Sequence, residues 1–286
     1  MKWLPFLSCG AFLFFSACQH DLSCESCSIS PPNRADTLPA NYPFANGFCK
    51  GASLGMTIPQ HDSARYSLTD LLPDSLLLDM PPAGDQGSQG SCSAWATVYA
   101  AGSYYNHIVK GTPYNDSTLL SPKYTYDQLT KGNCVCTSIF DHLYLLETQG
   151  ACSLKDMPYN PAECAVQPDS VQVKKAVPFK IRTWYTVDLT NRALIKQQLL
   201  HKMPVLFATN PDDGFRRPLP PYLLSKRTGP SPNGHAMIIV GYNDARKAFR
   251  VMNSWGKSWA DNGFAWIDYE FFVQNLADPT GAVIVY

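Results

Sequence analysis

The stretch DQGSQGSCSAW at residues 85–95 places Cys92 directly after a glycine-containing loop and at the expected start of a helix. The first turn of a helix carries a partial positive charge and free backbone N–H groups, and both favour a thiolate over a neutral thiol. A small buried residue or one half of a disulfide would also fit at this position. We therefore treat Cys92 as a candidate nucleophile and look for its partners.

The pattern of apolar residues predicts helices in the first half of the chain and strands in the second. Residues 92–109 have apolar and small residues at helical spacing, which predicts a closely packed central helix. Further helices are expected over residues 140–149, ending at Gly150, and over residues 190–201. Short β-rich runs between turn residues predict strands at 205–209, 236–242, 249–252, 264–267 and 282–286. This order indicates an α+β fold with two lobes that meet at a cleft.

Two segments of the second half contain residues that could assist a thiol nucleophile. His235 enters an apolar strand from a glycine-containing turn in NGHAMIIVGY at residues 233–242. Asn253 follows a strand in MNSWG at residues 252–256, where it could accept a hydrogen bond from a histidine and fix its tautomer. A lone histidine at a strand edge is more often structural, so His235 is a candidate base only in combination with Cys92 and Asn253.

Taken together, these motifs resemble those of the papain-like cysteine peptidases, the papain and cathepsin family. The order Gln, Cys, His, Asn agrees with that family, and the local motifs around Cys92, His235 and Asn253 agree as well. The resemblance covers about residues 72–286. It implies a papain-like two-lobed fold, with a helical N-terminal lobe, a β-rich C-terminal lobe and the active-site cleft between them.

The resemblance also implies a function, namely thiol-dependent hydrolysis of peptide bonds in a peptide or protein substrate. Cys92 would attack the carbonyl carbon, and His235 would be the imidazolium that protonates the leaving amine. Asn253 would orient His235, and Trp255 would shield this pair from water. Gln86 would donate its side-chain N–H to the oxyanion. Neither a cofactor nor a metal is expected, and the Cys92 thiol should titrate well below its ordinary range.

Three positions depart from the pattern of the family. Ser93 stands where a tryptophan is usual, and residues 136–137, Cys-Thr, stand where two glycines usually let substrate approach the cleft wall. Gln89 replaces a cysteine whose partner would be Cys134, so Cys134 must be free or paired elsewhere. The candidate partners are Cys136, Cys152 and Cys164. These departures leave one alternative open, a catalytically silent papain-fold binding protein anchored at the membrane.

The first 71 residues differ in character from the predicted domain. Residues 1–17 predict a signal peptide of the lipoprotein type, because Lys2 precedes an apolar run too short to span a membrane as a helix. FSAC at residues 15–18 resembles the lipobox of bacterial lipoproteins, so a lipidated Cys18 would anchor the protein in the bacterial cell envelope, with the outer membrane as the expected site. Ordinary cleavage would instead give a secreted protein. Residues 18–71 are interpreted as an extended tether or short pro-like segment, without the period of a helical propeptide.

The composition of the 286 residues narrows the class of protein further. A hydrophobic share of 45% excludes an intrinsically disordered chain. Lys plus Arg and Asp plus Glu both number 23, so no basic excess is present for binding nucleic acid. The ten cysteines favour an oxidising compartment. Cys24 and Cys27 have no second pair at zinc-finger spacing, so we expect a local disulfide there rather than a metal site.

Overall fold

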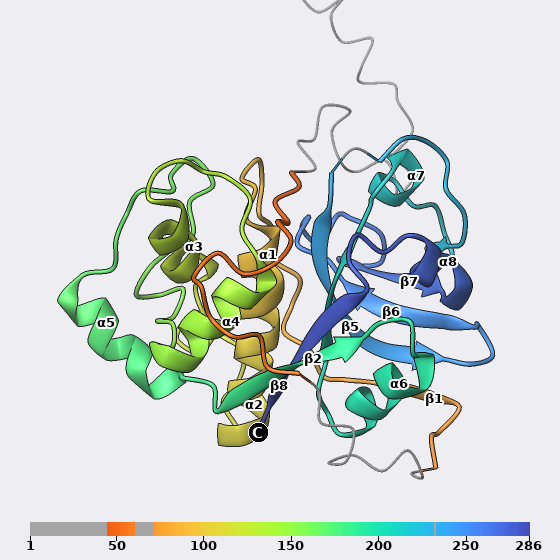
Figure 1. The fold of residues 1–286 in the computed structure, drawn as a ribbon, viewed down its shortest axis with the longest axis horizontal. Helices are drawn as coiled ribbons and strands as arrows, with labels where there is room; N and C mark the ends of the chain where they lie inside the picture. Colours follow the sequence, from red (N-terminus) through yellow and green to blue (C-terminus); the bar gives the residue numbers. More distant parts are fainter. Residues whose placement is uncertain (1–44, 61–70, 232) are drawn as a thin grey trace, which may run out of the picture. The chain divides into compact units, whose positions relative to one another are not determined.

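The computed structural model describes residues 45–60, 71–231 and 233–286, all within one compact unit of the chain (Figure 1). The predicted signal peptide at residues 1–17, the predicted lipidation site Cys18, and the pair Cys24 and Cys27 lie outside the described residues. Within the described unit, helices gather on one side and a sheet on the other (Figure 1). The predicted α+β, two-lobed architecture is confirmed.

A continuous helical run that begins at Cys92 forms the centre of the helical lobe. It consists of α1 (Cys92–Ala94), the π-helix η4 (Trp95–Gly102) and α2 (Ser103–Lys110). The predicted central helix is therefore present, but its middle is wound as a π-helix rather than an α-helix. The other helices of this lobe are α3 (Pro122–Thr130), α4 (Ile139–Thr148), α5 (Ser170–Ala176) and the 3₁₀-helix η5 (Val177–Phe179). Helix α4 ends before Gly150, whose φ of +79° lets its N–H return to the carbonyls of the last turn.

The second lobe is built on a sheet whose strands in the described residues have the order β2-β8-β3-β5-β6-β7-β4, with β1 added to β5. All pairs are antiparallel except β4 with β7. The five predicted strands are β3 (Val205–Thr209), β5 (His235–Asn243), β6 (Ala248–Met252), β7 (Phe264–Asp268) and β8 (Thr280–Val285). The strands that were not predicted are β1 (Ser75–Leu77), β2 (Thr183–Asp188) and β4 (Leu223–Leu224). Helices α6 (Arg192–Leu200), α7 (Asp213–Arg216) and α8 (Tyr269–Gln274) accompany this sheet.

Each lobe has its own hydrophobic core, and β5 contributes to both. Ile238 packs in the core formed around the helical run, whereas Ile239 packs in the core of the sheet with Phe207 and Phe249. Successive side chains of a strand point to opposite faces, so one strand can serve two cores. This position of β5 brings its first residue, His235, to the junction between the lobes.

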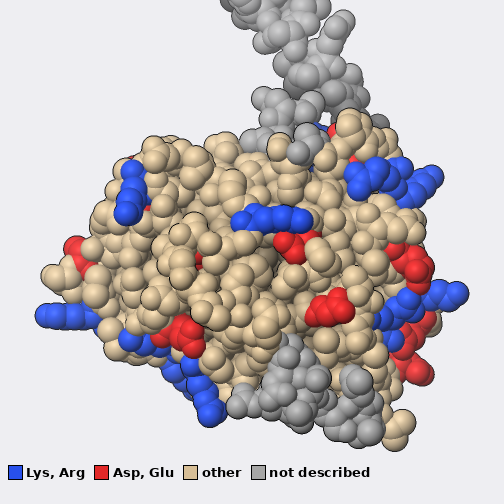
Figure 2. Space-filling model, in the orientation of Figure 1, with Lys and Arg blue, Asp and Glu red and all other residues tan. Residues whose placement is uncertain are grey.

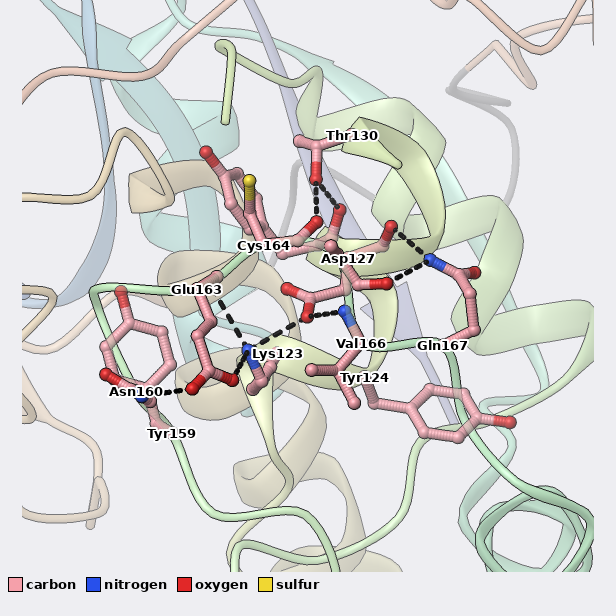
Figure 3. A network of polar contacts seen from close by, with 12 residues as sticks. Lys123, Tyr124, Asp127, Thr130, Tyr159, Asn160, Glu163, Cys164, Val166 and Gln167 are labelled. Atoms are coloured by element: carbon pink, nitrogen blue, oxygen red, sulfur yellow. Dashed lines mark hydrogen bonds and ion pairs between the residues drawn. The ribbon is translucent and has the colours of Figure 1, made fainter. Parts of the chain in front are cut away.

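A buried ion pair secures the loop that follows α4 to helix α3 (Figure 3). Lys123 Nζ lies 2.9 Å from the carboxylate of Asp127 on the same helix and donates to the carbonyl of Glu163 at 3.0 Å. The N–H of Val166 donates to the same carboxylate at 3.0 Å. Burial raises the pKa of Asp127, and the contact with Lys123 opposes that shift. The aspartate therefore depends on Lys123 for compensation of its charge.

Charges of both signs are scattered over the face of the molecule seen in Figure 2. This distribution agrees with the equal numbers of basic and acidic residues. None of the helices in the described part of the chain is long and apolar enough to cross a membrane. Among the same residues, no group of three or more His, Cys, Asp or Glu side chains is placed to hold a metal ion.

We predict that Lys123→Ala lowers the free energy of unfolding far more than the same substitution of an exposed lysine that also pairs with an aspartate. Loss of Lys123 leaves the Asp127 charge buried and unpaired, which costs about 3–5 kcal/mol of unfolding free energy. Lys175 pairs with Asp156 at the surface, where solvent screens the pair, so Lys175→Ala should cost much less. Urea denaturation of both variants measures this difference. Equal losses would show that the ion pair is not a specific stabilising contact.

Candidate active site

Cys92 begins helix α1, as the sequence predicts, and its side chain is fully buried. Its sulfur accepts two backbone hydrogen bonds, one from Ala236 on β5 at 3.3 Å and one from Gly47 at 3.2 Å. The contact with Ala236 joins the helical lobe to the sheet directly beside His235. The contact with Gly47 comes from a segment that the sequence did not indicate as part of the site.

His235 and Asn253 are brought together as predicted, with His235 Nε2 and Asn253 Oδ1 2.7 Å apart. Asn253 directly follows β6, the neighbour of β5 in the sheet. The ring of Trp255 stacks on the imidazole at 4.4 Å between centroids and covers the pair, as expected for a shielding residue. All three side chains are buried.

The hydrogen bonds around Asn253 define the tautomer of His235. Asn253 Oδ1 also accepts the N–H of Ser254 at 2.7 Å, so this atom is an acceptor and His235 Nε2 is the donor. His235 Nδ1 is buried without a hydrogen-bond partner among the described residues. In the neutral ring Nδ1 therefore carries the lone pair that can accept a proton.

Gln86 is buried and its amide is fixed in one orientation. The side-chain oxygen accepts from Ser254 Oγ at 2.6 Å, and the backbone N–H of Gln86 donates to the carbonyl of Ser254 at 2.8 Å. The side-chain nitrogen therefore points the other way and donates to the carbonyls of Gln89 at 2.8 Å and Ala45 at 2.9 Å. Sequence reasoning identified Gln86 but missed Ser254, because only the folded chain shows that the asparagine loop holds this amide.

Tyr159 holds the loop that precedes Cys92. Its hydroxyl lies within hydrogen-bond distance of three groups: the Gln86 carbonyl at 2.9 Å, Gln89 Oε1 at 3.0 Å and Ser91 Oγ at 2.7 Å. Gln89, which occupies the position of a family cysteine, also donates to the carbonyl of Glu163 at 2.7 Å. Hydrogen bonds thus take the place of a disulfide in fixing this loop.

Two disulfides form among the described cysteines, and they explain one departure from the family pattern. Cys134 pairs with Cys164, one of the three candidate partners named from the sequence. Cys136 pairs outside that cluster with Cys49, a connection that the sequence did not indicate. Cys92 is a free thiol, as predicted, and so is the buried Cys152.

Burial keeps the Cys92 thiol and the His235 imidazole neutral in this structure. Desolvation raises the pKa of Cys92 to about 11, although the N–H groups of Ala236 and Gly47 oppose the shift. Burial likewise lowers the pKa of His235 to about 4, against the effect of the Asn253 contact. Burial of the sulfur therefore opposes the thiolate that the helix start favours.

Comparison with known proteins agrees with this geometry. The family profile described as "Papain family cysteine protease" matches residues 78–275. This chain belongs to the papain family of cysteine proteases. Solved structures of similar fold include xylellain, a cysteine protease from Xylella fastidiosa, with a TM-score of 0.69 and 22% identity over 87% of this chain and 98% of that one. The digestive procathepsin L2 proteinase from Tenebrio molitor has a TM-score of 0.72 at 19% identity and covers 94% of this chain and 88% of its own.

Curated relatives of this papain-family chain are similar to it over only part of their own length. The gamete and mating-type specific protein A of Dictyostelium discoideum is 27% identical over 70% of this chain and 44% of its own length. The probable cysteine protease RD19B of Arabidopsis thaliana is 25% identical over 64% of this chain and 53% of its own. The chain spans about half the length of the curated relatives it matches.

We predict that the buried neutral His235 makes the stability of this papain-family chain depend on pH. Its folded pKa of about 4 lies below the ordinary value of 6.5, so the unfolded chain takes up a proton first as the pH falls. The stabilisation is therefore fully present above pH 6.5 and is lost between pH 6.5 and about 4. His235→Gln should reduce the slope of unfolding free energy against pH in this window by about 1.4 kcal/mol per unit. Denaturant titrations across the window test this, and an unchanged slope would contradict it.

Proposed function

We propose that this chain hydrolyses peptide bonds by thiol catalysis with a Cys92, His235 and Asn253 arrangement. The observation that carries the proposal is the hydrogen bond from His235 Nε2 to Asn253 Oδ1, which leaves Nδ1 available on the strand that contacts the Cys92 sulfur. Proton transfer between a thiol and a correctly oriented imidazole is the first requirement of this chemistry. Membership of the papain family supports the same assignment.

The proposed reaction proceeds through a thioester. His235 takes the thiol proton, and the Cys92 sulfur attacks the peptide carbonyl to give a tetrahedral oxyanion. Gln86 Nε2 and the N–H of Cys92 at the start of α1 stabilise that oxyanion, since the first N–H groups of a helix have no intrahelical acceptor. The oxyanion collapses, the C–N bond breaks, and His235 protonates the leaving amine. Water, deprotonated by His235, then cleaves the thioester to a carboxylic acid and the free thiol.

The departures at Ser93 and Thr137 are compatible with this function because they form part of an ordered cleft wall. Ser93 Oγ donates to the carbonyl of Thr137 at 2.7 Å. Thr137 Oγ1 lies 2.8 Å from His142 Nε2, and His142 Nδ1 lies 2.8 Å from Thr125 Oγ1. Burial lowers the pKa of His142 to about 3, so this histidine is a neutral structural group. The small residue at 93 therefore positions the wall instead of filling the cleft.

We predict that Cys92→Ser abolishes hydrolysis of a peptide library, because serine in this position has no thiolate to attack with. Cys152→Ala is the matched control, since Cys152 is also a buried free thiol but has no proposed role in the reaction, and this variant should keep its activity. Gln86→Ala should lower kcat about 10²–10³-fold through loss of one oxyanion donor. Mass spectrometry of the digests, after treatment of each protein with a thiol reductant, measures the rates.

The same experiment separates the peptidase from a silent binding protein. Cleavage by Cys92→Ser at the wild-type rate would remove Cys92 from the mechanism. A folded wild-type protein that is alkylated at Cys92 but cleaves no peptide would replace the peptidase with the binding-protein alternative.

We propose that the enzyme acts at the cell envelope, anchored by lipid on Cys18. The support is the sequence FSAC at residues 15–18 after a short apolar run, together with the cysteine content of the chain. In this arrangement residues 19–44 would connect the anchor to the described domain. Secretion without lipid is the alternative outcome.

We predict that metabolically supplied fatty acid labels the wild-type protein and that Cys18→Ala removes the label and the membrane association. Cys24→Ala changes a neighbouring cysteine of the same segment and should retain both. Fractionation and gel detection of the label make the measurement. A wild-type protein that is unlabelled and fractionates as soluble would contradict the anchor.

A further inference from the structure

Residues 45–49, which we name the cleft segment, occupy the groups that the proposed function needs for substrate. The carbonyl of Ala45 accepts from Gln86 Nε2 at 2.9 Å and from Trp255 Nε1 at 3.3 Å. The N–H of Gly47 donates to the Cys92 sulfur at 3.2 Å. The oxyanion donor and the nucleophile are therefore both engaged by the chain's own backbone.

The cleft segment is bound in a way that does not lead to its own cleavage. It offers the sulfur an N–H group, which has no electrophilic carbon. It then pairs in parallel with the cleft wall, where Thr137 N–H donates to the carbonyl of Gly47 at 2.9 Å and Cys49 N–H donates to the carbonyl of Thr137 at 3.0 Å. The segment is thus held as an inhibitor through backbone contacts.

Glycine at position 47 is required for this fit. A Cβ atom there would lie 1.7 Å from the carbonyl oxygen of Gly90, in the loop before the nucleophile, and neither backbone can yield easily. On the far side, a Cβ atom at Gly234 would lie 2.9 Å from the ring of Phe48. The segment therefore fits closely against both the nucleophile loop and the histidine strand.

The end of the cleft segment and the chain that follows it are bound to the helical lobe by several contacts. The disulfide between Cys49 and Cys136 comes first, two residues after Gly47. Beyond it, Ser138 Oγ donates to the carbonyl of Gly51. The carboxylate of Asp141, in the first turn of α4, accepts from Ser53 N at 2.9 Å and Ser53 Oγ at 2.6 Å. Of these contacts only the disulfide is covalent, and a thiol reductant can break it.

We propose that the Cys49–Cys136 disulfide is a redox switch that keeps the cleft segment over Cys92 until a thiol reductant breaks it. A covalent link two residues from Gly47 makes occupation of the cleft intramolecular over a very short span, which raises its effective concentration. Without that link the segment has to compete with substrate through a few backbone hydrogen bonds. This inference rests on the proposed function, because it describes how access to the same site is controlled.

The reductant is a small monothiol or a dithiol, and the exchange is balanced. A thiolate attacks one sulfur of the disulfide and forms a mixed disulfide, and a second thiol releases it. The products are the two free thiols of Cys49 and Cys136 and one oxidised reductant, after transfer of two electrons and two protons. The disulfide is open to such attack because Cys136 is exposed and lines a surface hollow of about 220 Å³ together with Cys49. The other disulfide has one buried end at Cys164 and does not involve the cleft segment.

Release of the segment should change the reactivity of Cys92 as well as its accessibility. Burial is the largest cause of the raised pKa of this thiol. Removal of the segment lets water reach the sulfur and so favours the thiolate beside His235. Alkylation of Cys92 at neutral pH is therefore a readout of opening that does not depend on peptide hydrolysis.

The test compares oxidised full-length wild type with two double variants, without reductant. Cys49→Ser with Cys136→Ser removes the proposed switch, and alkylation of Cys92 by iodoacetamide should accelerate at least about tenfold together with hydrolysis of a peptide library. Cys134→Ser with Cys164→Ser removes the other disulfide and should leave both rates at the wild-type level. Gly47→Ala keeps both disulfides but cannot fit under Gly90, so it should also accelerate alkylation. Peptide mapping by mass spectrometry gives the rate at each cysteine.

Each outcome has one interpretation. Unchanged alkylation in the folded Cys49→Ser, Cys136→Ser protein would overturn the switch, and so would equal acceleration in the Cys134→Ser, Cys164→Ser control. Faster alkylation without any hydrolysis would support the switch and overturn the proposed peptidase function. Wild-type protein reduced by a dithiol and desalted under anaerobic conditions repeats the comparison without substitutions, and it decides the matter if a double variant fails to fold.

Discussion

The contact between the Cys92 sulfur and the N–H of Ala236, 3.3 Å long, joins two lobes that have separate hydrophobic cores. Neither lobe alone contains a complete site, because the thiol starts a helix and the imidazole starts a strand. Strand β5 contributes side chains to both cores, and this packing fixes His235 at the junction of the lobes, next to the thiol. The hydrogen bond that Ser254 Oγ donates to Gln86 Oε1 is a second connection between the nucleophile loop and the sheet. Packing of the lobes and assembly of the site are therefore one event.

Much of the fold could be predicted because it follows from local patterns. The five predicted strands are runs of apolar residues bounded by turns, and the helical run after Cys92 carries its apolar residues at regular spacing. Helix α3 was missed because its polar residues suggest a solvated surface, whereas Lys123 and Asp127 are buried against each other. Strand β2 was missed although residues 183–187 are all β-branched or aromatic and favour a strand. Its pairing with β8 at the far end of the chain could not be predicted from local sequence.

The candidate site was predicted residue by residue, but its occupant was not. Cys92, His235, Asn253 and Gln86 belong to motifs that are defined by side-chain identity, so these positions could be identified from the sequence. The cleft segment acts through backbone N–H and C=O groups, which every residue possesses, and only the glycine at position 47 has a steric reason that the folded chain reveals. The bond between Cys49 and Cys136 spans 87 residues, and spacing alone could not select it among the available cysteines.

The buried state of the Cys92 thiol has a consequence for the chemical lifetime of the protein. Peroxides convert thiolates to sulfenic acid and then irreversibly to sulfinic acid, and the rate follows thiolate content and exposure. With the cleft segment in place, the sulfur is fully buried and its pKa is raised to about 11, so both conditions for damage are absent. The segment that denies substrate access thus also preserves the sulfur against oxidative inactivation. Oxidising conditions would form the Cys49–Cys136 bond, and the same conditions would damage an uncovered thiolate.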